Sequence, residues 1–277
     1  QVSPTRMYLL KPQFESDQKP LSMNELNSVS VNAKTGKDFR IGSYSTVSDD
    51  VLIGDNVEIG TCALIADGAR IGNNVKIFHG ASIGTVPQDL KFEGESTTVE
   101  VGDGTVVREF VTLNRATNHS KRTIIGRNCF IMAYAHVAHD CRLGDNVILA
   151  NGVQMGGHVE IGDWVIVGGL VAIHQFVKIG KHAMIGGGFR VVKDVPPFIL
   201  AGSVPLRFEG INLVGLRRRG FSNEQIHVIS GTYDLLYKSG LNVSDAVARI
   251  EKEMSDKPEA MDIVNFIKES KRGIIRG

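Results

Sequence analysis

The most regular feature of this chain is an aliphatic residue at every sixth position through its central part. Read in groups of six, residues 41–84 run IGSYST, VSDDVL, IGDNVE, IGTCAL, IADGAR, IGNNVK, IFHGAS and IG. The same phase resumes over residues 101–116 and again over residues 125–196. Each group opens with Ile, Val, Leu or Met, its second residue is often Gly, and its fifth is mostly small or β-branched. A helix repeats at about 3.6 residues and a strand alternates at about 2, so neither explains this pattern.

A period of six predicts short strands joined by sharp turns and wound into a prism, with three hexads in each coil. The aliphatic first residue is expected to point inward and to stack on its equivalent in the next coil. The small fifth residue fits near a corner, and the glycine is expected to allow the backbone turn there. With coils about 4.8 Å apart, the prism would be roughly 35–40 Å long. We expect it to span residues 29–197.

The hexad signature resembles that of the left-handed parallel β-helix family, although the period by itself does not show the hand. The predicted fold is therefore all-β, a left-handed parallel β-helix of hexapeptide repeats followed by a small α-helical domain. Two segments break the phase, residues 85–100 and residues 117–124, and we interpret them as insertions that leave the coil at a corner. Long insertions in such arrays commonly gather on one face and serve binding.

The period ends after the Pro196–Pro197 pair, and we assign residues 198–277 to a C-terminal helical domain, with helical spacing from Ser222 onward. Ser222 is a predicted N-cap, with Gln225 as its capping-box partner. Ser244 is a second predicted N-cap, and Pro258 suits the first turn of a third helix. This C-terminal helical domain is expected to cover the open end of the prism.

Charge nearly cancels, with 31 Lys and Arg residues against 30 Asp and Glu residues. This balance argues against nucleic acid as a partner, since such proteins usually carry a strong basic excess. No apolar run approaches the ~18 residues of a membrane span, so we expect no stable membrane insertion. Residues 1–28 form an N-terminal extension that begins without Met. This start suggests a mitochondrial, organelle-matrix location if the protein is eukaryotic, and a cytoplasmic one otherwise.

Histidines recur at one register of the predicted coils. One coil after His139 come Gly157 and His158, and one further coil on come His174 and Gln175. A middle position of a hexad points outward, so these side chains are not core residues. Three readings remain open: a general base oriented by the adjacent Asp140, a zinc site of three imidazoles, or surface histidines that only form hydrogen bonds.

Several further motifs accompany the hexads, namely QDLKFEGE, AHVAHDC, GGHV, HQF and GLRRRGFS. In combination, from about residue 41 to the C-terminus, they make the chain resemble the UDP-N-acetylglucosamine O-acyltransferases, the enzymes that start lipid A biosynthesis. The resemblance implies transfer of an (R)-3-hydroxyacyl group from acyl carrier protein to the 3-hydroxyl of the sugar in UDP-N-acetylglucosamine. It implies no cofactor beyond the phosphopantetheine arm of the carrier, no metal, and a homotrimer with active sites between adjacent prisms.

The resemblance also implies roles for individual residues. His139 would be the general base, Asp140 would orient it, and the backbone N–H of Gly157 would stabilise the oxyanion. Gly187 matches the position that sets acyl length, and a small residue there implies a chain of about fourteen carbons. Val214 replaces an acid that the family often carries, so one nucleotide contact is not expected. The other substrate-binding residues by similarity are Gln88, Asp89, Lys91, His136, His158, His174, Gln175, Asn212, Arg218 and Arg219.

Other function classes stay open on the residues alone. A prism of this kind could be another hexapeptide-repeat acyl- or acetyltransferase, or a zinc carbonic anhydrase with ligands among His136, His139 and His158. It could also be a non-catalytic scaffold that binds partners. A transferase acting on amines is disfavoured, because about 40 residues before the hexads are too few for the usual N-terminal nucleotide-binding domain.

Overall fold

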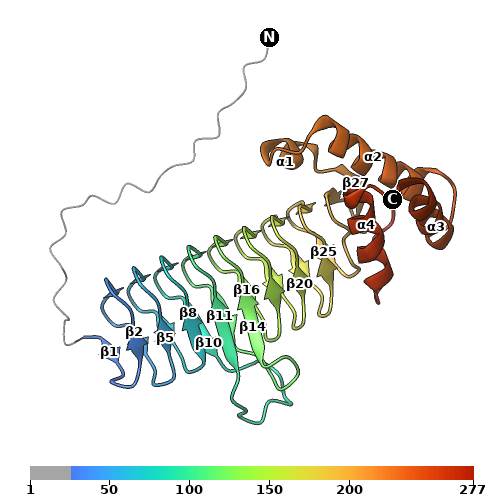
Figure 1. The fold of residues 1–277 in the computed structure, drawn as a ribbon. Helices are drawn as coiled ribbons and strands as arrows, with labels where there is room; N and C mark the ends of the chain where they lie inside the picture. Colours follow the sequence, from blue (N-terminus) through green and yellow to red (C-terminus); the bar gives the residue numbers. More distant parts are fainter. Residues whose placement is uncertain (1–25) are drawn as a thin grey trace.

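The computed structural model describes residues 26–277, so residues 1–25, most of the predicted N-terminal extension, lie outside the described part. The rest forms a left-handed parallel β-helix with helices at its C-terminal end (Figure 1). Strands of successive coils pair in parallel with a spacing of eighteen residues, as in Thr46 with Leu64 and Leu64 with Ser82. The coil predicted from the hexads is therefore the coil observed.

Three sheets form the faces of the prism, and each coil contributes one short strand to each of them. The first sheet contains β1 (Ser28–Val29), β4 (Thr46–Val47), β7 (Leu64–Ile65), β10 (Ser82–Thr85), β13 (Thr112–Asn114), β16 (His136–Val137), β19 (Gln154–Met155), β22 (Ala172–Ile173) and β25 (Arg190–Val191). The second contains β2 (Lys34–Thr35), β5 (Leu52–Ile53), β8 (Ala69–Ile71), β11 (Thr98–Val101), β14 (Arg122–Ile125), β17 (Arg142–Leu143), β20 (Glu160–Ile161) and β23 (Lys178–Ile179). The third contains β3 (Arg40–Ile41), β6 (Glu58–Ile59), β9 (Lys76–Ile77), β12 (Val106–Val107), β15 (Phe130–Ile131), β18 (Ile148–Leu149), β21 (Ile166–Val167), β24 (Met184–Ile185), β26 (Ile199–Gly202) and β27 (Arg207–Ile211).

The core is a column of aliphatic side chains along the axis of the prism. From Val47 to Val191 the opening residue of every hexad is buried, and so are small fifth residues such as Ala63 and Val147. Removing this apolar surface from water is the main favourable contribution to folding, at about 25 cal/mol per Å². The inward direction expected for the first position and the tight fit expected for the fifth are both observed.

The expected role of the second-position glycines is wrong. The left-handed turn lies two residues later, at the fourth position, where residues such as Asn146 (φ 59°) and Trp164 (φ 61°) adopt it without being glycine. The second position instead lies against the backbone of the next coil. An ideal Cβ on Gly126 would lie 2.2 Å from the carbonyl oxygen of Gly144. Glycine is therefore required there by space between coils and not by its backbone torsion.

Both insertions leave the prism at the edge between the first and second sheets, where Figure 1 shows two loops side by side. The first connects β10 to β11 and the second connects β13 to β14. β11 and β14 pair from Thr98–Arg122 to Val101–Ile125, so the strands extend into the segments that the sequence assigns to insertions. The loops themselves are residues 86–97 and 115–121, which are shorter than the predicted 85–100 and shifted from the predicted 117–124.

The C-terminal part begins with an antiparallel pair, β26 and β27, that extends the third sheet. The four helices follow as α1 (Leu213–Arg218), α2 (Asn223–Lys238), α3 (Val243–Met254) and α4 (Pro258–Glu269). The capping box of Ser222 and Gln225 and the position of Pro258 at the start of α4 are confirmed. The cap predicted at Ser244 is wrong, because Asn242 is the N-cap and its side chain accepts a hydrogen bond from the Asp245 N–H.

Buried polar contacts attach the C-terminal part to the last coils of the prism. The carboxylate of Asp194 accepts hydrogen bonds from the Lys178 N–H (2.8 Å) and the Ser270 hydroxyl (2.6 Å). The buried Tyr233 hydroxyl donates to the Pro197 carbonyl at 2.6 Å. These bonds hold the helices over the last coils (Figure 1). Within residues 26–277, none of the helices has the length and apolar character that a membrane crossing demands.

We predict opposite effects for alanine at two glycines. Gly126→Ala should lower stability by about 1–3 kcal/mol, because the new methyl group overlaps the next coil. Gly231→Ala is the matched control in α2, where the nearest atom to a Cβ is Met254 Cε at 3.7 Å. It should raise stability by about 0.5–1 kcal/mol. Calorimetric melting temperatures check both, and an unchanged melting temperature for Gly126→Ala would contradict the steric explanation.

Candidate active site

His139 and Asp140 lie at the same edge of the prism from which the two loops emerge. β16 ends at Val137 and β17 begins at Arg142, so both residues occupy the turn between the first and second sheets. Asp140 takes the fourth, left-handed position of its hexad with φ 60°. This turn directs its carboxylate toward the loop above the coil.

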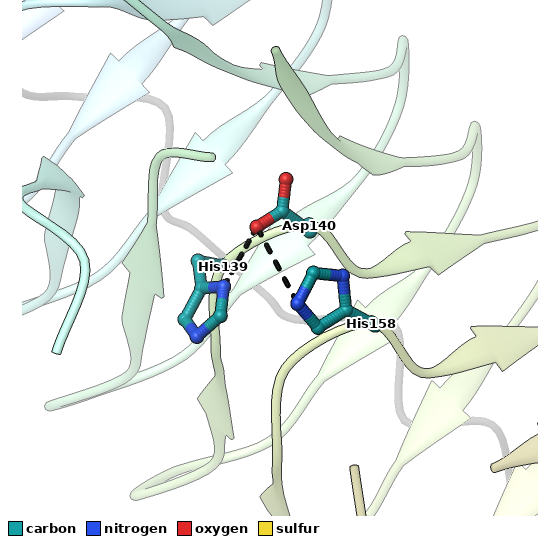
Figure 2. Close-up of side chains that lie close together, drawn as sticks. All are labelled: His139, Asp140 and His158. Carbon is teal, nitrogen blue, oxygen red and sulfur yellow. Dashed lines mark hydrogen bonds and ion pairs between the residues drawn. The ribbon is translucent and has the colours of Figure 1, made fainter. Parts of the chain in front are cut away.

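The two side chains form a short hydrogen-bonded pair. His139 Nδ1 lies 2.7 Å from Asp140 Oδ2 (Figure 2), and the Asp140 side chain is fully buried. Burial by itself would raise the pKa of Asp140, but hydrogen bonds from His139, Ser120 and Thr117 outweigh it and hold the pKa well below its usual range. The carboxylate is therefore ionised at neutral pH, and His139 donates its Nδ1–H to it. Its Nε2 points away from Asp140 (Figure 2).

Gly157 lies directly against the His139 ring, one coil further along. A Cβ at Gly157 would lie 2.5 Å from Cε1 and 2.7 Å from Nε2 of His139. The position is buried, and its carbonyl accepts a hydrogen bond from the Phe176 N–H. The backbone hydrogen bonds of residues 26–277 include none donated by the Gly157 N–H. This donor is thus available beside the imidazole.

His158 completes the buried side of the cluster. Its Nε2 lies 4.0 Å from Asp140 Oδ2, and its ring meets the His139 ring edge-on, with centroids 5.1 Å apart. The Phe176 ring stacks on it at 4.4 Å and the His119 ring meets its edge at 4.7 Å. Burial is the main reason that the pKa of His158 is lowered; the charge of Asp140 opposes it, and the neighbouring histidines add to it. His158 is therefore mostly neutral at pH 7.

Comparison with known proteins gives one consistent result. A sequence profile for the second domain of UDP-N-acetylglucosamine O-acyltransferases matches residues 194–275, and a bacterial transferase hexapeptide profile matches residues 32–67 and 122–157. The acyl-[acyl-carrier-protein]–UDP-N-acetylglucosamine O-acyltransferase of Thiobacillus denitrificans is 43% identical over 90% of this chain and 96% of its own length. Its counterpart in Thermodesulfovibrio yellowstonii is 42% identical over 92% of this chain and 100% of its own length.

The chain belongs to the UDP-N-acetylglucosamine O-acyltransferase family. Solved structures agree with this assignment. The UDP-N-acetylglucosamine acyltransferase from Bacteroides fragilis superposes with a TM-score of 0.90 at 46% identity, over 92% of this chain and all of that one. The Arabidopsis UDP-N-acetylglucosamine acyltransferase has a TM-score of 0.77 at 29% identity, over 91% of this chain and 99% of its own.

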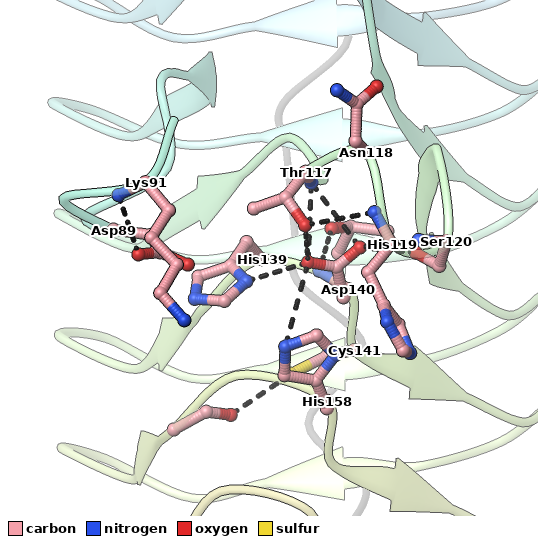
Figure 3. Close-up of polar contacts among 12 residues, drawn as sticks. Asp89, Lys91, Thr117, Asn118, His119, Ser120, His139, Asp140, Cys141 and His158 are labelled. Atoms are coloured by element: carbon pink, nitrogen blue, oxygen red, sulfur yellow. Dashed lines mark hydrogen bonds and ion pairs between the residues drawn. The ribbon is translucent and has the colours of Figure 1, made fainter. Parts of the chain in front are cut away.

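Other residues expected from the family resemblance lie near the histidine pair. His136 is half-buried on β16, where its Nδ1 lies 2.7 Å from the Thr112 hydroxyl, and burial lowers its pKa. Asp89 and Lys91 approach from the first loop (Figure 3), and the Asp89 carboxylate accepts a hydrogen bond from the Lys91 N–H at 3.0 Å. Gln88 is exposed beside them, and His174 and Gln175 are exposed on a further coil along the same edge.

The remaining expected residues lie on other edges of the prism. Gly187 follows β24 and is exposed at the edge between the third and first sheets. Asn212 is buried and donates to the His182 carbonyl at 2.9 Å, at the edge between the second and third sheets. Arg218 and Arg219 lie at the C-terminal end of α1 beside that edge. A single chain therefore brings together the histidine cluster but not the whole set.

Whereas Arg218 is exposed, Arg219 is half-buried and has side-chain contacts within residues 26–277. Its guanidinium lies over the Trp164 ring at 5.4 Å, and its Nη1 lies 3.5 Å from Nδ1 of His182. His182 in turn stacks on Phe198 and meets Phe221 edge-on. Burial, followed by the charge of Arg219, lowers the pKa of His182 to about 4.

The three-histidine zinc alternative finds no support in the geometry. Within residues 26–277, the one group of potential ligands whose atoms lie within 4.8 Å of one another is His139, Asp140 and His158, without His136. Asp140 Oδ2 already accepts hydrogen bonds from the Thr117 hydroxyl and from His139. A metal ion bound at this oxygen would compete with both of these donors.

The sequence reasoning missed the side chains that surround Asp140 from the second loop, Thr117, His119 and Ser120 (Figure 3). The hexads stop before this segment, so coil arithmetic assigns no register to it. The only signal in the sequence is the presence of two hydroxyl residues and a histidine in an insertion that leaves at the edge carrying His139.

The low pKa of His182 predicts a pH-dependent stability. A histidine that stays neutral in the fold costs stability as pH falls below its unfolded pKa of about 6.5, and the loss is complete below the folded pKa. The melting temperature of the native chain relative to His182→Gln should therefore decrease between pH 7 and pH 4. The exposed His227→Gln in α2 is the control for replacing a histidine by glutamine. A difference for His182→Gln that stays constant from pH 7 to pH 4 would refute the assignment.

Proposed function

We propose that this chain transfers an (R)-3-hydroxyacyl group from acyl carrier protein to the 3-hydroxyl of UDP-N-acetylglucosamine, the first step of lipid A biosynthesis. The observation that carries the mechanism is the short His139–Asp140 pair with the Gly157 backbone against its ring. Family membership supports the substrates, because the relatives are named for acyl carrier protein and UDP-N-acetylglucosamine. The proposed reaction requires no cofactor apart from the carrier's phosphopantetheine.

In the proposed reaction His139 is the general base. Its Nε2 removes the proton of the sugar 3-hydroxyl while the hydroxyl oxygen attacks the thioester carbonyl carbon. The ionised Asp140 holds the Nδ1–H tautomer and stabilises the imidazolium that forms. When the tetrahedral intermediate collapses, the C–S bond breaks and the thiol of the carrier leaves with the proton from His139. The acyl oxygen ester forms, and the histidine returns to its neutral state.

The oxyanion of the tetrahedral intermediate needs a donor that is already in place. We assign this role to the Gly157 N–H, which has no backbone acceptor within residues 26–277 and belongs to the residue lying against the His139 ring. A preorganised donor of this kind typically contributes about 10²–10³ in rate. Because His158 beside the pair is neutral, the positive charge that develops during the reaction lies on the imidazolium of His139.

The distribution of the expected binding residues supports an assembly of several copies. Gln88, Asp89, Lys91, His136, His158, His174 and Gln175 accompany His139, whereas Gly187 and Asn212 lie at the other two edges. One substrate can reach residues on more than one of these edges only when the edge of one prism packs beside a different edge of another. We therefore propose a homotrimer with an active site between each pair of adjacent prisms.

Within this assembly we assign the pyrophosphate first to Arg218, because it is exposed while Arg219 lies over Trp164. A guanidinium pairs with phosphate oxygens in a fixed geometry. Arg219 would then act on the same subsite mainly by holding the end of α1. The mitochondrial location expected from residues 1–28 gains no support from the relatives compared above, most of which are bacterial, and it stays a prediction.

His139→Ala should lower kcat by about 10²–10⁴ through loss of the general base. The assay combines UDP-N-acetylglucosamine with a series of 3-hydroxyacyl carrier proteins. His227→Ala, an exposed histidine of α2, is the matched control and should retain full activity. Full activity of His139→Ala would contradict the mechanism, and no transfer with any chain length would contradict the proposed function.

Gly187 predicts the acyl length that the enzyme accepts. The native chain should prefer a donor of about fourteen carbons, and Gly187→Met should shift the preference to shorter donors, because the new side chain would occupy the space that the end of a longer acyl chain takes. The ratio of kcat/KM values across the donor series measures the shift. An unchanged preference in Gly187→Met would show that the acyl chain does not reach this edge.

A further inference from the structure

The carboxylate of Asp140 is enclosed mainly by one surface loop, residues 115–121. Thr117 donates through its hydroxyl (2.7 Å) to Oδ2 and through its N–H (3.2 Å) to the same oxygen. Ser120 donates through its N–H (3.0 Å) and its hydroxyl (2.5 Å) to Oδ1. Among residues 26–277, the one other donor to this carboxylate is Nδ1 of His139. Figure 3 shows this convergence on a single carboxylate.

The hydroxyl groups of Thr117 and Ser120 both donate their proton to this carboxylate. The Thr117 oxygen already accepts the His119 N–H at 3.2 Å, so its single proton points to Asp140. The Ser120 oxygen also lies 2.9 Å from the Arg122 carbonyl, but the shorter bond to an ionised acceptor is the stronger one. Both carboxylate oxygens are therefore held in place, and Oδ2 faces His139 Nδ1.

We propose that Thr117 and Ser120 are positioning residues for the His139–Asp140 pair. They fix the orientation of the carboxylate and disperse its negative charge, so that His139 keeps its Nδ1–H tautomer. This proposal rests on the proposed function for its kinetic consequences but not for its structural ones. In this proposal the second loop acts on the reaction through Asp140, without touching the substrate.

The physical consequence is a dependence on pH. Each hydrogen bond to the carboxylate favours its ionised form, in line with the low pKa of Asp140. Without these hydrogen bonds the Asp140 carboxylate would attract a proton more strongly. The His139–Asp140 pair would therefore take up a proton at higher pH. The other titratable groups around the pair, which stay unchanged in the experiment, are His119, Lys121, His136 and His158 together with Asp89, Lys91 and Glu95 of the first loop.

The experiment compares Thr117→Val, Ser120→Ala and the double variant with Thr117→Ser, which keeps the hydroxyl. Asn118→Ala is the matched control in the same loop, because its side chain bonds Lys121 and not Asp140. We expect kcat to fall about tenfold in each single variant and roughly a hundredfold in the double variant, with KM for the sugar nucleotide within twofold. The acid limb of the kcat/KM profile should move up by about one pH unit in the double variant. Thr117→Ser and Asn118→Ala should keep the native profile.

A second measurement separates this proposal from the proposed function. Long-range ¹H–¹⁵N spectra of the histidine rings report the tautomer of His139 and the pH at which it titrates, with no substrate present. The native chain should show the Nδ1–H form, and the double variant should titrate at higher pH. An unchanged tautomer and titration in the double variant would overturn the proposal, even with an active enzyme. A shifted titration in an enzyme that transfers no acyl group would support it while refuting the proposed function.

The same substitutions in an Asp140→Asn background test whether Asp140 carries the effect. If Thr117 acts through this carboxylate, Thr117→Val should add less than twofold to the loss caused by Asp140→Asn. A full additional tenfold loss would show that Thr117 acts elsewhere and would overturn the proposal. Melting temperatures of all variants check for loss of folding, and the single variants Thr117→Val and Ser120→Ala carry the test if the double variant does not fold.

Discussion

The close stacking of one coil on the next is the constraint on which the rest of this protein depends. Backbone donors of each coil pair with carbonyls of the next, and the second position of the hexad lies so near its neighbour that Gly126 and Gly144 leave no room for a methyl group. This spacing puts residues one coil apart on the same edge. Residues at the same position of successive coils therefore form a line, and His139, Gly157 and Gln175 follow one another along it.

A prism with a core this narrow has little depth in which to bury a functional group. The chain creates that depth by adding loops at one edge. Residues 115–121 cover Asp140 and donate to it, so a carboxylate on the outside of a coil becomes fully buried and ionised. Some residues with proposed substrate contacts, such as Gly187 and Arg218, lie on or beside the other edges, which is why an arrangement of several copies suits the proposed reaction.

At the edge between the second and third sheets, aromatic side chains hold an arginine in place. Trp164 and His182 occupy left-handed corners, and Arg219 lies over the former and beside the latter. Because this arginine has partners in its own chain, Arg218 is the one that remains exposed to a ligand. Adjacent arginines at the end of one short helix thus differ in exposure and contacts for a reason visible only in their surroundings.

The hexads determined by themselves the coil, its core and the edge on which the histidines gather, because period and burial are local properties that repeat. They also indicated where the chain leaves the coil, and the capping box of Ser222 marked the start of α2. Three things depended on tertiary structure: the reason for glycine at the second position, the cap at Asn242 and the enclosure of Asp140 by Thr117 and Ser120. The path of a loop and the spacing between coils come from contacts between residues far apart in the chain, and no local pattern encodes them.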